Sequence, residues 1–191
     1  MTIRETPLSG LVVVEPKVFG DARGFFQETW HAARYAEAGL PTDWVQDNLS
    51  RSVRGTLRGL HFQRAPHAQA KLVHVLDGSV FDVAVDLRDG SPTFGRWYGE
   101  ELSADNHRQM FVPEGFAHGF VVTSETALFA YKVAGGAYTP EAEGALAWDD
   151  PDVGVEWPLR DGVAPLLSAK DQQAASLARW ATHAPFPRAD G

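Results

Sequence analysis

Short β-rich segments separated by strong turn formers are the feature that most constrains the fold of this chain. Turn-forming sequences such as Asp77-Gly78, Pro113-Glu114-Gly115 and Gly135-Gly136 punctuate runs rich in Val, Leu and Phe. Many short strands at such spacing predict a sandwich or barrel. The segments that we predict as strands are residues 11–18, 44–48, 57–63, 71–76, 80–87, 96–102, 109–112, 119–123 and 128–133.

The segment 80–87 alternates in a way that assigns its two faces. The odd positions, from Phe81 to Leu87, are all apolar, whereas Asp82 and Asp86 lie on the opposite face. The apolar row predicts a face buried in the core. The two acids either are solvated or line a pocket, and the pattern alone does not separate these readings.

Helix is scarce, and the sequence predicts a single domain. Residues 31–39 are typical of a short helix that ends at Gly39. A C-terminal helix is predicted over about residues 169–181, with Ser168 as its N-cap. We find no internal repeat, low-complexity segment or linker, so residues 1–191 are expected to form one domain with few helices.

Composition excludes several classes of function. The chain lacks cysteine, which excludes disulfides and thiolate zinc sites. Its net charge of -8 disfavours binding to nucleic acid. No apolar run approaches the roughly 18 residues needed to span a bilayer, so no membrane partner is expected. The N-terminal residues lack the apolar core of a signal peptide, and we therefore expect a cytoplasmic protein.

His61 is a candidate base, a metal ligand or a hydrogen-bonded core residue. A metal site in a barrel of this kind uses two histidines separated by one residue, and here the second position holds Gln63. The downstream position, where such a site would carry a Glu, holds Lys71, whose cation would repel a divalent metal. His118 remains as a distal ligand, but two isolated histidines do not form a site. Metal-free chemistry is therefore predicted.

Three further residues have a structural and a functional interpretation. Lys71 is either a solvated charge at the start of a strand or, if it shares a cavity with His61, a stabiliser of an enolate oxygen. Tyr131 either packs as an amphipathic strand residue or donates a proton to a carbanion. Asp171 is either an acid in the first turn of a helix or the group that orients His61.

Several longer motifs occur in fixed order and together are similar to one known family. The motifs are DARGFFQETW (21–30), QDN (46–48), LRGLHFQ (57–63), the run from AKLVHVL to FGRW (70–97), PEGFAHGF (113–120), AYKV (130–133) and LSAK (167–170) followed by Asp171. Through these motifs, across residues 3–171, the chain resembles the dTDP-4-dehydrorhamnose 3,5-epimerase family.

The resemblance implies a mainly β jelly-roll barrel of the cupin type, usually a homodimer, without a metal or other cofactor. It also implies 3,5-epimerisation of dTDP-4-keto-6-deoxy-D-glucose to dTDP-4-keto-L-rhamnose in dTDP-L-rhamnose biosynthesis. His61 matches the family's base, Tyr131 its acid and Asp171 the partner of the base. Lys71 matches the residue that supports the enolate. Substrate-contacting positions are matched by Arg23, Phe26, Glu28, Gln46, Asn48, Arg58, His118, Tyr138, Glu143 and Lys170.

The residue types suit a nucleotide-linked sugar. The guanidinium groups of Arg23 and Arg58 would hold the diphosphate, which places a local basic clamp in a net acidic protein. Phe26 resembles the residue that packs on the nucleotide from the partner subunit, and Tyr138 resembles a base-stacking aromatic. Strict strand alternation would place Arg58 and His61 on opposite faces. Either Gly59 hosts a bulge or Arg58 reaches the pocket by another route.

Two alternatives remain open at the level of sequence. A C3- or C5-only epimerase of an antibiotic-sugar pathway would use the same base and acid. A non-catalytic cupin that binds a sugar nucleotide would be expected to lack one of them, and His61, Tyr131, Lys71 and Asp171 are all present.

Overall fold

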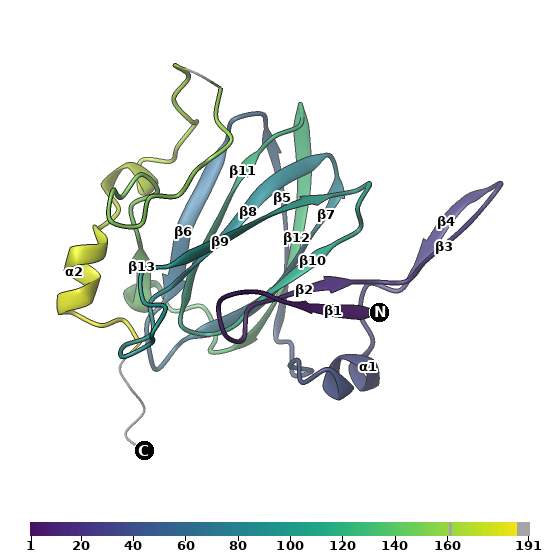
Figure 1. Cartoon of the computed structure of the whole chain (residues 1–191), viewed down its shortest axis with the longest axis horizontal. Coiled ribbons are helices and arrows are strands. Elements are labelled where there is room, and N and C mark those ends of the chain that lie inside the picture. The colour runs from purple at the N-terminus through teal and green to yellow at the C-terminus, as the bar shows by residue number, and fades with distance from the viewer. Residues whose placement is uncertain (161, 187–191) are drawn as a thin grey trace.

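Two antiparallel sheets packed face to face form the body of the protein (Figure 1). The computed structural model describes residues 1–160 and 162–186. The first sheet contains, in spatial order, β1 (Thr2–Glu5), β2 (Val12–Glu15), β10 (Gln109–Val112), β7 (Gln69–Asp77), β12 (Thr126–Gly135) and β5 (Gln46–Val53). The second contains β13 (Glu143–Ala145), β6 (Leu57–Gln63), β11 (Phe116–Val122), β8 (Ser79–Asp86) and β9 (Trp97–Ser103). The predicted mainly β jelly-roll barrel is confirmed.

Most strands coincide with predicted segments, and two have the predicted bounds, 57–63 and 109–112. The segment 11–18 was wrong as a single strand. Pro16 has no backbone N–H to donate to a ladder, and the chain leaves the first sheet after Glu15. Val18 then begins β3 (Val18–Asp21), which pairs with β4 (Gly24–Gln27) in a separate two-stranded sheet. The short strands β1 and β13 were not predicted.

Apolar side chains fill the space between the sheets and cover their outer faces. Between the sheets, Val73, Met110 and Phe129 from the first sheet pack with Val80 and Phe120 from the second. A second cluster covers the outer face of the second sheet, and a third lies under the N-terminal segment. The second includes Leu60, Phe62, Val83, Val85, Leu87, Leu146 and Trp180, and the third includes Val14, Trp30, Tyr35, Leu40 and Leu72.

Both faces of β8 are buried, so the solvated reading of its two acids is wrong. The predicted apolar row from Phe81 to Leu87 packs in the outer cluster, as expected. Asp82 and Asp86 point into the barrel and have no exposed surface. Asp82 contacts His118 near the cavity described below, whereas Asp86 lies in a separate polar network.

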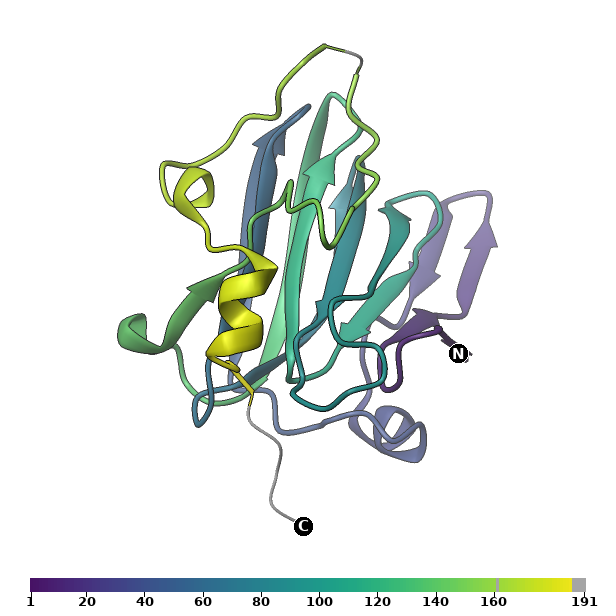
Figure 2. The same ribbon diagram turned by 60° about the vertical axis from the view of Figure 1, so that its left-hand side comes forward.

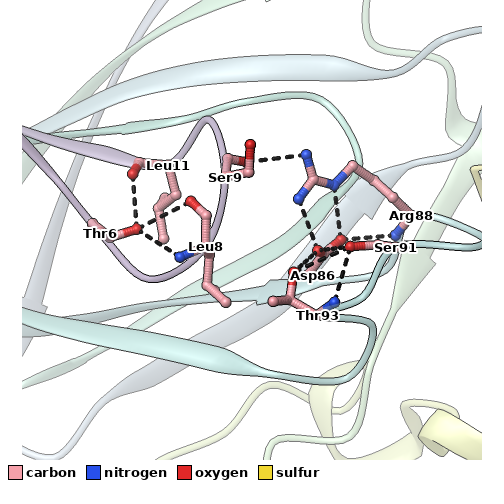
Figure 3. A network of polar contacts seen from close by, with 8 residues as sticks. All are labelled: Thr6, Leu8, Ser9, Leu11, Asp86, Arg88, Ser91 and Thr93. Carbon is pink, nitrogen blue, oxygen red and sulfur yellow. Dashed lines mark hydrogen bonds and ion pairs between the residues drawn. The ribbon is translucent and has the colours of Figure 1, made fainter.

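Asp86 ties three segments together (Figure 3). Its carboxylate accepts hydrogen bonds from the Arg88 guanidinium and from the hydroxyls of Ser91 and Thr93, at 2.6–2.9 Å. Arg88 donates onward to the carbonyl of Ser9 at 3.0 Å and so anchors the turn before β2. Burial raises the pKa of Asp86, but these hydrogen bonds outweigh burial and hold the pKa below its usual range.

Asp86→Asn is expected to lower the free energy of unfolding by about 3 kcal/mol at neutral pH, because it leaves a buried network without its charge. Urea titration followed by circular dichroism would measure this loss. The carboxylate contributes above its unfolded-state pKa, and its contribution is lost as pH falls through the lower folded-state value. The two proteins should therefore converge in stability in acid. Asp89→Asn, an exposed change nearby, is the control, and an equal effect there would contradict the assignment.

The C-terminal helix differs from its predicted bounds. The predicted helix over 169–181 is wrong in its first half, where a 3-10 turn, η2 (Asp171–Gln173), is followed by extended chain. Ala175 bonds to the backbone beside β13 and so continues that sheet edge instead of a helix. The helix α2 (Leu177–Thr182) begins later, and its N-cap is Ser176, not Ser168. It lies over the outer face of the second sheet (Figure 2).

The other short elements confirm the scarcity of helix. The predicted helix before Gly39 forms as α1 (Ala32–Glu37), and a 3-10 turn, η1 (Pro140–Ala142), precedes β13. None of the helices in residues 1–160 and 162–186 has the length and apolar character needed to cross a bilayer.

The hairpin of β3 and β4 projects from the barrel (Figure 1). Its three phenylalanines, Phe19, Phe25 and Phe26, are exposed, and Phe26 is the most exposed of them at 70%. Apolar side chains gathered on a projecting element mark a surface that contacts another molecule.

Candidate active site

A cavity of about 460 Å³ lies inside the barrel between the two sheets. The second sheet contributes His61 from β6 and His118 from β11, whose positions pair directly across the two strands. The first sheet contributes Lys71 from β7 and Tyr131 from β12. The volume suits a small ligand. The cavity is also lined by Ser50, Thr56, Leu57, Arg58, Gly119, Phe120, Phe129, Leu166, Leu167, Ser168 and Asp171.

His61 is held by Asp171, the residue that follows the last predicted motif. The Nε2 atom of His61 lies 2.5 Å from Oδ1 of Asp171. The other carboxylate oxygen of Asp171 accepts a hydrogen bond from the Ser168 hydroxyl at 2.8 Å. Both oxygens of a buried carboxylate are thus satisfied, and the imidazole is oriented by its contact with one of them. Asp171 is thus an acid in the first turn of η2, as one interpretation predicted, and its side chain also contacts His61, as the other predicted.

The electrostatics of Asp171 favour an ionised partner for His61. Burial raises the pKa of the Asp171 carboxyl, but hydrogen bonds from His61 and Ser168 outweigh burial, so the pKa lies below its usual range. An ionised carboxylate beside the ring stabilises the imidazolium that forms when His61 takes a proton. His61 is partly exposed to the cavity, with 32% of its side chain accessible. A base needs such access to its substrate.

A bulge at Gly59 resolves how Arg58 reaches the cavity. In the pairing of β6 with β11, His61 faces His118 and Arg58 faces Phe120, so β6 holds one extra residue between the two pairs. Gly59 has φ +135°, and an added Cβ would lie 2.5 Å from the backbone of Gly119. Only glycine fits there. Arg58 consequently lines the same cavity as His61.

Lys71 lies in the cavity wall, and the reading of it as a solvated edge charge is wrong. It is half-buried, it is the third residue of β7, and it lines the cavity. Burial lowers the pKa of Lys71 to about 8, although Asp82 and Glu143 attract its charge and oppose the change. The ammonium is thus charged at neutral pH and close to the point at which it loses its proton.

Tyr131 presents its phenol to the cavity from the sheet opposite His61. Burial raises the pKa of Tyr131, and the nearby Arg58 opposes that change only in part. The phenol therefore keeps its proton at neutral pH and can donate it. A base on one wall and a proton donor on the other is the arrangement that inverts a carbon held between them.

A second hollow adjoins the cavity and shares His61, Lys71 and Tyr131 with it. Lys170 lies beside this hollow and forms an ion pair with Glu143. Tyr138 donates a hydrogen bond to the same carboxylate at 3.3 Å. Four of the predicted substrate-contacting residues line it: Gln46, Asn48, Tyr138 and Glu143.

The side chain of Gln63 is hydrogen-bonded to the backbone. Its side-chain oxygen accepts a hydrogen bond from the amide of Thr139 at 2.9 Å, so the oxygen that a metal would need is already used. In the described parts of the chain, no three His, Asp or Glu side chains gather as a ligand set. That the chemistry needs no metal and no cofactor stays a prediction.

Three predicted residues lie away from the cavity. Arg23 and Phe26 belong to the projecting hairpin, where Arg23 pairs with its neighbour Asp21 at 2.5 Å. Glu28 follows the hairpin and pairs with Arg34 of α1. Within one chain, these side chains do not reach the other predicted contacts.

Sequence reasoning missed several polar residues around the site. Ser168 was read as a helix cap, and its contact with Asp171 arises only once the 3-10 turn forms. Ser52 accepts a hydrogen bond from Arg58 at 3.0 Å and fixes that guanidinium. The alternation of β5, which puts Asn48, Ser50 and Ser52 on one face, is the sequence signal that would have identified Ser52.

Comparison with known proteins gives one consistent result. Residues 5–179 match the family model described as dTDP-4-dehydrorhamnose 3,5-epimerase. The dTDP-4-dehydrorhamnose 3,5-epimerase of Pseudomonas aeruginosa is 56% identical over 169 residues, which cover 88% of this chain and 91% of that protein.

Solved structures agree with this match. A 3,5-epimerase from Legionella pneumophila, in complex with dTDP-4-keto-L-rhamnose, has a TM-score of 0.91 and 48% identity over 100% of this chain and 99% of that chain. A 3'-monoepimerase from Streptomyces bikiniensis, in complex with dTDP-quinovose, has a TM-score of 0.89 and 32% identity over 96% of this chain and 92% of that chain. The chain belongs to the dTDP-4-dehydrorhamnose 3,5-epimerase family.

Proposed function

We propose that this protein inverts C3 and C5 of dTDP-4-keto-6-deoxy-D-glucose to give dTDP-4-keto-L-rhamnose, in dTDP-L-rhamnose biosynthesis. The observation that carries the proposal is the placement of His61, held by Asp171, and Tyr131 on opposite walls of one cavity. The sequence similarity of this chain to 3,5-epimerases supports the choice of substrate.

The chemistry follows from the C4 ketone of this substrate. The ketone acidifies the C–H bonds at C3 and C5, and His61 removes a proton from one face to leave an enolate. Lys71 stabilises the negative charge on the C4 oxygen, which is the main reduction of the barrier. Tyr131 then returns a proton to the opposite face, so the carbon is inverted. Exchange with solvent then removes the proton that His61 gained and restores the one that Tyr131 lost, and repetition at the second carbon gives the doubly inverted sugar.

The hollow beside the cavity suits the nucleotide. Gln46 and Asn48 offer amide groups to a pyrimidine, and Tyr138 offers a ring for stacking. Arg58, fixed by Ser52, is placed to bind the diphosphate between nucleotide and sugar. Each end of the substrate thereby has a matching set of side chains.

We further propose that the protein works as a homodimer whose projecting hairpins complete each other's sites. Arg23 and Phe26 lie too far out to serve their own cavity, and their exposure suits contact with a second copy. Light scattering coupled to gel filtration would measure the oligomeric state. Phe26→Ser should raise KM for the nucleotide sugar, whereas a monomer with unchanged KM would contradict this arrangement.

We place the enzyme in the cytoplasm, and cell fractionation would test that location.

A single-centre epimerase is the second candidate. The similarity to a 3'-monoepimerase, with a TM-score of 0.89, shows that the same barrel serves an enzyme of that name. The identity to that protein is 32%, against 48% and 56% for the 3,5-epimerases above. The double epimerase is therefore the function that we favour.

Incubation of the purified protein with the proposed substrate in D₂O tests both candidates. Deuterium at C3 and C5, followed by NMR, is expected for the double epimerase. Deuterium at one carbon alone would support the single-centre enzyme. No exchange at either carbon would contradict the proposed function.

A further inference from the structure

The segment that carries Asp171 is fixed to the strand that carries His61. Leu166 donates a backbone hydrogen bond to the carbonyl of Gly55 at 2.8 Å. It also accepts one from the amide of Leu57, the first residue of β6, at 3.0 Å. These bonds place the start of the segment beside the start of the strand. One end of the segment is therefore held by backbone contacts alone.

The other end of this segment is held by the strand β13. Ala175 donates a backbone hydrogen bond to Ala145 at 3.1 Å and accepts one from Ala147 at 2.8 Å. Ala145 is in turn the register partner of His61 in the pairing of β13 with β6. Residues 166–175 thus form an arch that is anchored to β6 at one end and to β13 at the other. These backbone bonds place the arch beside His61 and leave the orientation of its side chains to other contacts.

Within the arch, one hydroxyl fixes the direction of the Asp171 carboxylate. Oγ of Ser168 donates a hydrogen bond to Oδ2 of Asp171 at 2.8 Å and accepts one from the backbone amide of Asp171 at 3.2 Å. The carboxylate is therefore tied to its own backbone through Ser168. Its other oxygen, Oδ1, points at Nε2 of His61. Only 4% of Asp171 is exposed, so the carboxylate has little water to replace this donor.

This chain of contacts selects one nitrogen of the His61 ring as the base. Nε2 faces an ionised carboxylate, so the neutral ring carries its proton on Nε2 and donates it to Asp171. Nδ1 then holds the lone pair. It has no hydrogen-bond partner among the described residues and is not one of their buried unpaired atoms, so it is open to the cavity that His61 lines.

We propose that Ser168 is a positioning residue: through Asp171 it keeps His61 protonated at Nε2, so that Nδ1 is the atom that removes protons from the sugar. This inference rests on the proposed function and extends it by naming the reacting atom. When Nδ1 takes a proton from C3 or C5, the electron pair of the broken C–H bond moves into the enolate. The ring becomes an imidazolium, and the carboxylate of Asp171 balances its charge.

The tautomer of His61 can be measured by ¹⁵N NMR of the full-length protein labelled in its histidines. Correlations between the ring nitrogens and the carbon-bound ring protons distinguish a protonated nitrogen from an unprotonated one. A His61→Gln variant assigns the signals of His61 among the seven histidines. In the neutral ring, we expect Nε2 to be protonated and Nδ1 to be unprotonated. The opposite tautomer in the wild-type protein would overturn the inference.

Ser168→Ala tests the role of the hydroxyl. Without the hydrogen bond to Oδ2, the Asp171 carboxylate is no longer fixed and holds the Nε2 proton less firmly. The His61 signals should move toward a mixture of the two tautomers. We expect kcat to fall about 10-fold, as for the loss of a hydrogen bond to a charged group, with KM changed far less.

Ser168→Thr keeps a hydroxyl and should retain most of the wild-type kcat. Ser168 is exposed, so the added methyl group has room. Equal losses of kcat in Ser168→Ala and Ser168→Thr would overturn the inference. If Ser168→Ala does not fold, Ser168→Cys replaces it, because a thiol is a weak donor in nearly the same place. A wild-type tautomer in that variant would equally overturn the inference.

Ser176→Ala is the matched control for a loss of stability alone. Ser176 caps α2 by accepting a hydrogen bond from the amide of Arg179 at 3.4 Å, and it lies outside the arch. Its replacement should lower the melting temperature and leave the His61 tautomer and kcat unchanged. If Ser168→Ala behaves in the same way, Ser168 serves the fold alone and the inference is wrong.

The NMR measurements need no substrate and are therefore independent of the proposed reaction. A wild-type protein that exchanges no deuterium overturns the proposed function. An unchanged His61 tautomer in Ser168→Ala overturns this inference alone.

Discussion

His61→Ala is expected to reduce deuterium exchange at both C3 and C5 by roughly 10³-fold, since one base serves both carbons. The cavity supports this expectation because His61 combines access to the interior with a buried, ionised partner in Asp171. His118, the neighbouring histidine, is almost fully buried and fixed by Asp82. It is not placed to take over the proton transfer. NMR of the sugar in D₂O, with both carbons followed in one sample, would measure the effect.

His183→Ala provides a control with the same change in an exposed histidine beyond α2. It should exchange deuterium as fast as the wild type. The decisive comparison is between the two carbons in His61→Ala. Exchange retained at either carbon would mean that a second base serves it, and the one-base mechanism would then be wrong.

The fold was largely predictable from sequence because its signals are local. Alternation and turn formers located β6 and β10 to the residue and identified the apolar face of β8. The errors arose where tertiary contacts decide. The first half of the predicted C-terminal helix instead holds a 3-10 turn followed by extended chain, because Ala175 bonds to the edge beside β13. Helix propensity in residues 169–175 could not reveal that sheet edge.

The site was predictable where a strand carries it and unpredictable where two distant segments meet. Alternation assigned the strand face of His61, and Gly59 pointed to the bulge that brings Arg58 into the cavity. The contact between Ser168 and Asp171 depends on a 3-10 turn, and the burial of Asp82 depends on the facing sheet. The sequence did not decide whether Asp82 is solvated or buried, because a polar strand face has the same residue pattern whether it faces water or a cavity.

Tyr131 is the residue whose replacement should separate exchange from inversion. His61 removes the proton from one face of the sugar and can return deuterium to that face, which gives exchange with retention. Inversion also needs a donor on the other face. Tyr131 lies on the opposite sheet, and burial raises the pKa of its phenol, so the group is protonated and able to donate at neutral pH.

Tyr131→Phe is accordingly expected to slow formation of the epimerised product by about 10²-fold while exchange falls far less. Parallel assays of product by chromatography and of deuterium by NMR would give the two rates. Tyr98→Phe is the control, because Tyr98 bonds to Glu100 and Arg4 away from the cavity, and its loss should leave both rates near those of the wild type. An equal fall in exchange and product for Tyr131→Phe would show that Tyr131 also acts in deprotonation, for example by holding the enolate oxygen together with Lys71.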